Sequence, residues 1–210
     1  MKTSALPFPL LAAGLLVLGA CTSPRVESAY APDSFDTSVD RAPTASTLHA
    51  TARVMAAQGR DAQCELVLRK LIDEHPDFLP AYNELAELHM RYGAIDSAVV
   101  TLEMGLERAP QDTVMLNNLG MCRLLQKRYD EALDSFTLAS AADPDDARAR
   151  ANMATTLGLL GRADEALALF YQVMPPADAH HNVAVLCRSI GDDERAALEF
   201  RRAEDPKLRR

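Results

Sequence analysis

The chain has 210 residues, of which 48% are hydrophobic and 25% are charged, and its formal net charge at pH 7 is −8. This acidic balance disfavours nucleic acid as a partner and disfavours general adsorption to anionic lipid. The length is sufficient for one extended domain with a continuous core.

Residues 1–20 have the layout of a secretory signal peptide. Lys2 precedes an apolar run at residues 10–18, which is too short to span a bilayer comfortably, and the segment has no acidic residue. It ends in the letters LGAC, which resemble the bacterial lipobox, where the cysteine is acylated and becomes the mature N-terminus. This resemblance implies a covalent lipid on Cys21, and Thr22 resembles the sorting signal for the outer membrane of Gram-negative bacteria. The alternative is an ordinary signal peptide in which Cys21 is incidental.

Residues 21–44 are predicted to form a disordered, lipid-anchored tether. The segment contains prolines and many serine and threonine residues, and it shows no helical periodicity. A flexible chain of this length has a root-mean-square reach of roughly 25 Å, so the folded domain would stand off the membrane surface. In the alternative reading, Tyr30 or Phe35 packs into the folded domain.

After the tether, apolar residues recur with helical spacing in paired segments separated by turns. Residues 79–110 predict a helical hairpin that turns at Gly93, with two apolar stripes at Tyr82, Leu85, Ala86 and His89, and at Ile95, Ala98, Val99, Leu102 and Leu106. A shift of 34 residues along the chain brings three prolines and four small residues into register: Pro76, Pro110 and Pro144, and Cys64, Ala98, Ala132 and Ala166.

This unit resembles the tetratricopeptide repeat, whose signature places are occupied in residues 79–112 by Tyr82, Leu85, Ala86, Gly93, Ala98, Leu102, Gly105 and Pro110. Small residues on the first helix are expected to face small residues on the second, because only these let two helix backbones approach closely. The pairs are Ala86 with Ala98, Gly120 with Ala132, and Ala154 with Ala166. The resemblance implies an all-α fold, a solenoid of about five helix-turn-helix repeats in a right-handed superhelix.

The repeat domain is predicted at residues 45–206, with repeats at about 45–78, 79–112, 113–146, 147–176 and 177–206. In the fourth repeat Pro175 and Pro176 should shorten the second helix by about one turn, because proline ends a helix and restricts the residue before it. The charged face from Glu194 to Glu204 is expected to cap the last repeat.

No sequence motif indicates catalysis or a bound metal, so we predict no enzymatic activity and no cofactor other than the lipid on Cys21. Cys64, Cys122 and Cys187 belong to different repeats and should lie too far apart to form disulfides. We expect buried free thiols. The histidines lack the spacing of a chelating helix face, which favours structural or solvent-facing roles.

The face made by the stacked first helices is the predicted binding surface. By analogy with other tetratricopeptide arrays, its lining comes from positions 2, 5, 6, 9, 12 and 13 of each repeat. The expected groove residues are Asn117, Asn118, Met121, Leu125, Asn152, Thr155 and Asn182, with asparagine recurring at position 6. Amide side chains can both donate to and accept from a peptide backbone. Alternatively, asparagine is merely tolerated at this position.

Arrays that grip a C-terminal carboxylate use lysine and arginine at positions 2, 5, 9 and 13. The second repeat has Pro80, Asn83, Glu87 and Arg91 there. The carboxylate clamp is therefore missing, and a partner segment with apolar anchors fits better than an acidic tail.

The lipobox, the tether and about five repeats ending in HHNVAVLCRSIGDDERAALEFRRAE together resemble the TadD-type lipoproteins of tight-adherence (Flp) pilus assembly. The resemblance implies an outer-membrane lipoprotein whose domain faces the periplasm and which helps to assemble or localise the secretin. No single residue carries over as a functional site. The alternatives are an adaptor lipoprotein that recruits peptidoglycan hydrolases and a type IV pilus pilotin, which usually has six repeats. The oligomeric state is not predicted.

Overall fold

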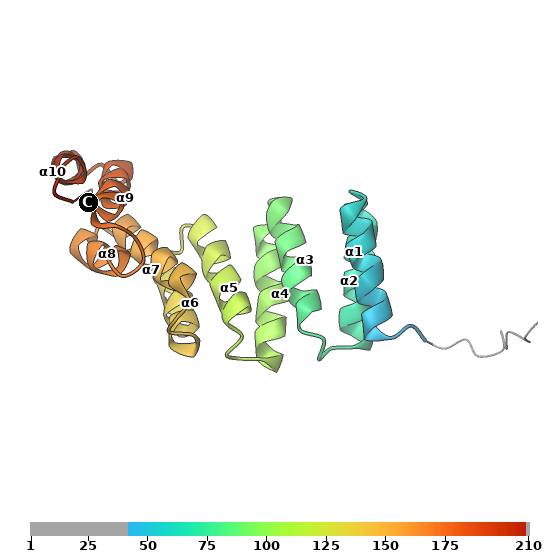
Figure 1. Cartoon of the computed structure of the whole chain (residues 1–210). Helices are drawn as coiled ribbons and strands as arrows, with labels where there is room; N and C mark the ends of the chain where they lie inside the picture. The colour runs from blue at the N-terminus through green and yellow to red at the C-terminus, as the bar shows by residue number, and fades with distance from the viewer. Residues whose placement is uncertain (1–41, 209–210) are drawn as a thin grey trace, which may run out of the picture. The chain divides into compact units, whose positions relative to one another are not determined.

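The computed structural model describes residues 42–208, so Cys21, the predicted signal peptide and nearly all of the predicted tether lie outside the described residues. Within this range the regular elements are ten α-helices, and there is no strand (Figure 1). They are α1 (Ala45–Ala57), α2 (Asp61–Glu74), α3 (Pro80–Arg91), α4 (Ile95–Arg108), α5 (Thr113–Leu125), α6 (Tyr129–Ala142), α7 (Ala147–Leu159), α8 (Ala163–Phe170), α9 (Pro176–Ser189) and α10 (Asp193–Ala203). None of these helices has the length and apolar character that a bilayer crossing requires.

Consecutive helices pair into hairpins, α1 with α2 and so on to α9 with α10, and each hairpin packs against the next. The second helix of one hairpin contacts the first helix of the following one, and the first helices α3, α5, α7 and α9 also contact each other in succession. A single hairpin cannot bury its apolar face, so this stacking builds the core. The predicted all-α solenoid of helix-turn-helix repeats is confirmed.

The turn inside each hairpin contains one residue with a positive φ angle. Four of these residues are glycine, among them Gly93 with a φ of 72°, and glycine adopts this conformation because it has no Cβ. In the third hairpin Lys127 stands at this place with a φ of 60°. The third turn therefore holds a non-glycine residue in the left-handed region, which is strained for an L side chain.

The small residues between paired helices lie where the sequence predicts. Ala86, Ala98, Ala132, Ala154 and Ala166 are each fully buried. Gly120 is also buried, and a Cβ atom added there would lie 2.5 Å from a ring carbon of Phe136. The ring of Phe136 on α6 therefore fills the space that glycine leaves on α5.

The fourth hairpin is clipped. α8 has 8 residues, whereas α2, α4 and α6 each have 14. After Phe170 the chain continues in tight turns, in which the backbone N–H of Met174 donates to the carbonyl of Phe170 at 2.9 Å. α9 then begins at Pro176, where a fixed φ suits the first turn of a helix. The predicted shortening is confirmed and is six residues, more than the single turn expected.

The charged segment from Glu194 to Glu204, which is predicted to cap the last repeat, is exposed at most of its charged residues, but Glu199 within it is fully buried. Its Oε2 lies 2.5 Å from Nδ1 of the buried His180. Its Oε1 lies 2.8 Å from Nε of Arg195 and 2.9 Å from a terminal nitrogen of Arg202. A buried carboxylate needs such partners, because burying an unpaired charge is very unfavourable. His180 also contacts the hydroxyl of Tyr171 at 2.8 Å, which joins the fourth hairpin to the fifth.

Candidate functional site

The predicted groove residues lie on three first helices that contact one another in succession. α5 carries Asn117, Asn118, Met121 and Leu125, α7 carries Asn152 and Thr155, and α9 carries Asn182. We call the surface formed by positions five and six of α1, α3, α5, α7 and α9, with the side chains beside them, the first-helix face. Positions are counted from the first residue of each predicted repeat.

Side chains on this face pair across successive repeats. The Nδ2 amide of Asn152 donates to Oδ1 of Asn117 at 2.9 Å, and the Nδ2 amide of Asn118 donates to Oδ1 of Asn83 at 3.4 Å. At the N-terminal end, Nε2 of His49 lies 2.6 Å from Oε1 of Glu84. Each pair joins position five of one repeat to position six of the next, 35 residues later. We call these three contacts the five–six ladder.

Asn182 does not join the ladder. Position five of the fourth repeat is Ala151, which has no side-chain acceptor, and the Nδ2 amide of Asn182 instead contacts the sulfur of Met174 at 3.2 Å. The clipped fourth hairpin places that methionine beside α9. The structure therefore pairs Asn117 with Asn152 and Asn118 with Asn83, and it leaves Asn182 outside these pairs.

The ladder leaves part of its hydrogen-bonding capacity unused. An asparagine amide has two N–H donors and an oxygen with two lone pairs, and each ladder contact uses one donor and one acceptor site. Asn117, Asn118 and Asn152 are all partly exposed, so the unused groups can reach solvent or a ligand. Beside them Leu125 is 54% exposed and Met121 partly so, while the hydroxyl of Thr155 donates to the carbonyl of Ala151 at 2.9 Å.

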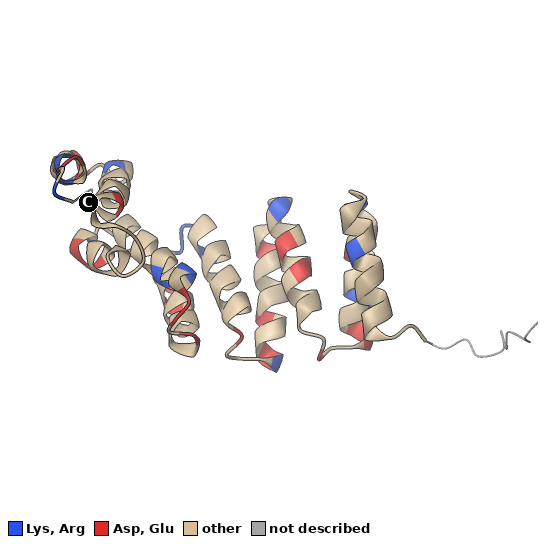
Figure 2. Cartoon of the chain, viewed as in Figure 1, with Lys and Arg blue, Asp and Glu red and all other residues tan. Residues whose placement is uncertain are grey.

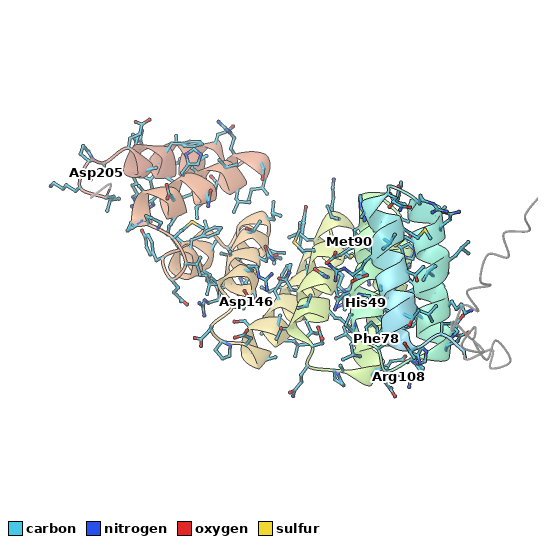
Figure 3. All side chains as sticks on the ribbon, turned by 45° about the vertical axis from the view of Figure 1, so that its right-hand side comes forward. His49, Phe78, Met90, Arg108, Asp146 and Asp205 are labelled. Atoms are coloured by element: carbon cyan, nitrogen blue, oxygen red, sulfur yellow. The ribbon has the colours of Figure 1, made fainter. Side chains whose placement is uncertain are left out.

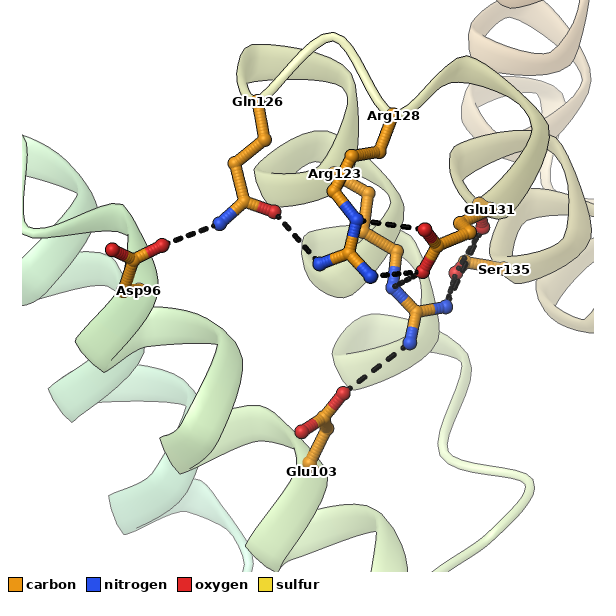
Figure 4. A network of polar contacts seen from close by, with 7 residues as sticks. All are labelled: Asp96, Glu103, Arg123, Gln126, Arg128, Glu131 and Ser135. Carbon is orange, nitrogen blue, oxygen red and sulfur yellow. Dashed lines mark hydrogen bonds and ion pairs between the residues drawn. The ribbon is translucent and has the colours of Figure 1, made fainter.

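The centre of the face has almost no charge. α5 carries a single charged residue, Arg123, and its ribbon is otherwise free of charged colours in Figure 2. Arg123 extends between the second helices, where a terminal nitrogen donates to Oγ of Ser135 at 2.8 Å and the other donates to Glu103 at 3.3 Å (Figure 4). A neutral strip of amides and apolar side chains thus runs along α5.

The N-terminal end of the face differs, because its ladder contact involves an ionisable pair. The ring of His49 packs against the ring of Phe78, which lies just before the start of α3, and the two ring centroids are 5.0 Å apart (Figure 3). The predicted lining positions 5 and 6 include His49, Asn83 and Glu84, but the sequence analysis did not predict that these side chains pair across repeats. The signal that could have found these pairs is the constant interval between positions five and six of consecutive repeats.

The described residues give no group of three histidine, cysteine or acidic side chains that could hold a metal ion. Cys64, Cys122 and Cys187 are buried free thiols, as predicted. Burial raises the pKa of Cys122 to about 11, and it also raises the pKa of the other two thiols. Each thiol is therefore protonated near neutral pH, the form that is a poor nucleophile and a poor metal ligand.

Two tetratricopeptide-repeat family models match the chain, one over residues 55–119 and the other over residues 112–175. Together they span more than half of the 210 residues.

Solved structures share the fold. A crystal structure of MamA superposes with a TM-score of 0.65 at 15% identity and covers 76% of this chain and 89% of that one. MamA from Desulfovibrio magneticus RS-1, from residue 41 to its end, superposes with a TM-score of 0.65 at 16% identity and covers 79% of this chain and 97% of that one. YrrB, described as a TPR protein with an unusual peptide-binding site, gives 0.63 at 20% identity, with 79% and 90% covered. Identities this low show a common fold alone.

Sequence relatives match over shorter stretches. The mouse (Mus musculus) protein O-mannosyl-transferase TMTC1 is 29% identical over 108 residues, which are 50% of this chain and 12% of that protein. The SGT1 homolog of Bos taurus is 33% identical over 70 residues, which are 33% of this chain and 21% of that protein. The chain thus spans a small part of these relatives, and their activities do not carry over to it.

Proposed function

The chain belongs to the tetratricopeptide-repeat family, and we propose that it is a non-enzymatic scaffold that binds a segment of a partner protein along the first-helix face. The observation that carries this proposal is the neutral centre of that face, where half-used amides lie next to exposed apolar side chains. Peptide-binding surfaces combine these two features, because amides hold the backbone of the ligand and apolar pockets select its side chains.

The chemistry of the face defines the segment that it would hold. The free amide groups of Asn117, Asn118 and Asn152 would bond to the backbone of the segment and fix its register. Leu125 and Met121 would contact an apolar anchor residue. Because α5 presents no charge to this face, the segment gains no ion pair there, and an apolar segment is favoured over a highly charged one.

Two substitutions test the face. Met121→Glu places a carboxylate at the apolar centre, and Asn152→Asp removes the amide donors and leaves an acceptor to which the amide of Asn117 can turn and donate. Both should reduce capture of the partner, and the helical circular dichroism should be unchanged. The control is Leu138→Glu, which changes an exposed side chain on the second helix α6. If both variants capture the partner as well as Leu138→Glu does, the first-helix face is not the binding surface.

We also propose where in the cell the chain acts. A lipid on Cys21 would hold the chain to the outer membrane, the segment that follows would act as a tether, and the repeat domain would face the periplasm. The support is the LGAC sequence and the proline- and serine-containing segment after it. Cys21→Ser should release the protein from the membrane fraction.

The partner that we propose is a secretin or another component of a tight-adherence pilus assembly apparatus. Support comes from the resemblance of the lipobox, tether and repeats to the TadD-type lipoproteins. Affinity purification of a C-terminally tagged chain from detergent-solubilised outer membranes, with mass spectrometry, tests it, and Cys21→Ser is the control. Recovery of a secretin that is lost in the control supports the proposal. Recovery of peptidoglycan hydrolases without a secretin would instead support the adaptor role. Recovery of type IV pilus components would support the pilotin role.

A further inference from the structure

A cavity lies away from the first-helix face. It has a volume of about 390 Å³ and opens between the second helices α2 and α4, with α3 as its floor. We call it the second-helix notch. Its apolar walls include Ile72, Leu85, Val100 and Met104, and its acidic residues are Asp73 and Asp96.

The next repeat shows what such a notch can hold. Arg123 of α5 stands 34 residues after His89 of α3, at the same place in its repeat. Its guanidinium group extends from Glu103 on α4 to Ser135 on α6 and so fills the space between two second helices (Figure 4). His89 makes the matching contact, since Nδ1 lies 3.5 Å from the hydroxyl of Thr101 on α4, and its Nε2 lies 3.6 Å from Oε1 of Glu65 on α2. Because its side chain is shorter, the space above it stays open.

The notch has two exposed apolar side chains at its mouth. Val100 is 57% exposed and Met104 is 46% exposed, and they lie one helical turn apart on α4. Behind them Ile72 and Leu85 are buried. This arrangement suits an aliphatic chain of a ligand, because such a chain would cover the apolar surface of Val100 and Met104 that now faces water.

The excess charge of the notch is negative. Arg69 also lines it, but its guanidinium is paired with Glu65 at 2.8 Å. Asp73 has no ion-pair partner among residues 42–208, and Asp96 accepts a hydrogen bond at 2.6 Å from the neutral amide of Gln126. Asp73 and Asp96 therefore lack a cation, while the two basic side chains of the lining, Arg69 and His89, both lie beside Glu65.

We propose that the second-helix notch binds a lysine or arginine side chain of a partner segment. The aliphatic stem packs on Val100 and Met104, and the cationic end pairs with Asp73 or Asp96. The side chain of the ligand would occupy the space between two second helices, as the side chain of Arg123 does in the next repeat. Since Arg69 replaces Glu103 at the equivalent position, the cation pairs at the ends of the notch instead. The site shares no residue with the proposed first-helix face, so either can fail alone.

The test uses the full chain with methyl-labelled methionine and follows the Met104 methyl resonance by NMR. The probes are n-hexylammonium, which has the stem and charge of lysine, and hexanoate, which has a similar stem and the opposite charge. We expect n-hexylammonium to shift the Met104 resonance in a saturable manner, and hexanoate to have a much weaker effect. Equal effects from both probes, or no shift with n-hexylammonium, would overturn the proposal.

Two kinds of variant complete the test. His89→Arg gives this repeat the side chain that fills the next one, and it should abolish the n-hexylammonium shift. Asp73→Asn and Asp96→Asn change exposed residues and should each weaken binding about two- to fivefold, the range of a surface ion pair. The control is Asp134→Asn, an exposed carboxylate on α6. If both exposed variants bind as the Asp134→Asn control does, the carboxylates do not form the site, even where His89→Arg fails to fold.

Discussion

The Nδ2 amide of Asn152 donates a hydrogen bond to Oδ1 of Asn117 at 2.9 Å and joins the first helices of the third and fourth repeats. The same side chains that are proposed to hold a partner thus also hold the array together. Asn118 and Asn152, the two position-six asparagines of the ladder, therefore have a structural role in this fold whether or not a ligand is bound.

We predict that Asn152→Ala lowers the free energy of unfolding by about 0.5–1.5 kcal/mol, the usual range for one hydrogen bond. Asn152→Asp should lower it less, because the amide of Asn117 can turn and donate to the new carboxylate. Urea denaturation of the three proteins gives the comparison. Equal losses in both variants would mean that the amide of Asn117 cannot adopt the reversed role.

The close approach of α5 and α6 gives a second prediction. Gly120→Ala places a Cβ atom 2.5 Å from the Phe136 ring, and Ala132→Leu adds atoms at a fully buried position. Each should lower the free energy of unfolding by about 1–3 kcal/mol through overpacking. The matched control is Ala141→Leu, an exposed alanine on the same helix α6. Thermal unfolding that is unchanged in Ala132→Leu would contradict the packing seen here.

The strained turn at Lys127 gives a third prediction. Its φ of 60° is disfavoured for an L side chain, so Lys127→Gly should raise the free energy of unfolding by about 0.5–1 kcal/mol, after the added freedom of glycine in the unfolded chain is subtracted. The reverse change, Gly93→Lys, should lower it by a similar amount of about 0.5–1 kcal/mol, because no atom lies within 4 Å of the added Cβ and the strain is again partly offset by the lost freedom of the unfolded chain. Lys127→Gly that destabilises would show that Lys127 makes contacts worth more than the strain.

The helical hairpins could be predicted from the sequence because their signals are local. The spacing of apolar residues, the glycine at Gly93 and the proline pair at Pro175 and Pro176 each act within one or two turns of helix. The small residues at Ala132 and its equivalents add a repeated steric requirement. Because the pattern recurs every 34 residues, the same helices and turns are predicted in several repeats. A weak signal in one repeat can therefore be interpreted from its neighbours.

The partners of individual polar side chains could not be predicted in the same way. Glu199 lies in a strongly charged segment, and only the fold shows that it faces His180 and two arginines. Asn152 and Asn117 each had a predicted position on the first-helix face, but their contact depends on how far one repeat advances over the next. The open notch above His89 likewise depends on a comparison of side-chain lengths between neighbouring repeats, which needs the positions of α2 and α4 on either side of α3.

Cys122 gives the last prediction, which concerns alkaline pH. Its thiol is fully buried, and desolvation raises its pKa from 9.0 to about 11. Below pH 9 the thiol is protonated in both the folded and the unfolded chain, so the stability it contributes is fully present. Between pH 9 and 11 the unfolded chain loses this proton and the folded chain keeps it, so stability is lost as the pH rises.

Cys122→Ala removes this titration and leaves the other alkaline groups in place. Across that window we expect the difference in free energy of unfolding between the variant and the unmodified chain to change by about 1 kcal/mol per pH unit, in favour of the variant. Urea denaturation at several pH values under reducing conditions measures it. Parallel curves would mean that the thiolate of Cys122 forms within the folded array, and that water reaches this buried side chain there.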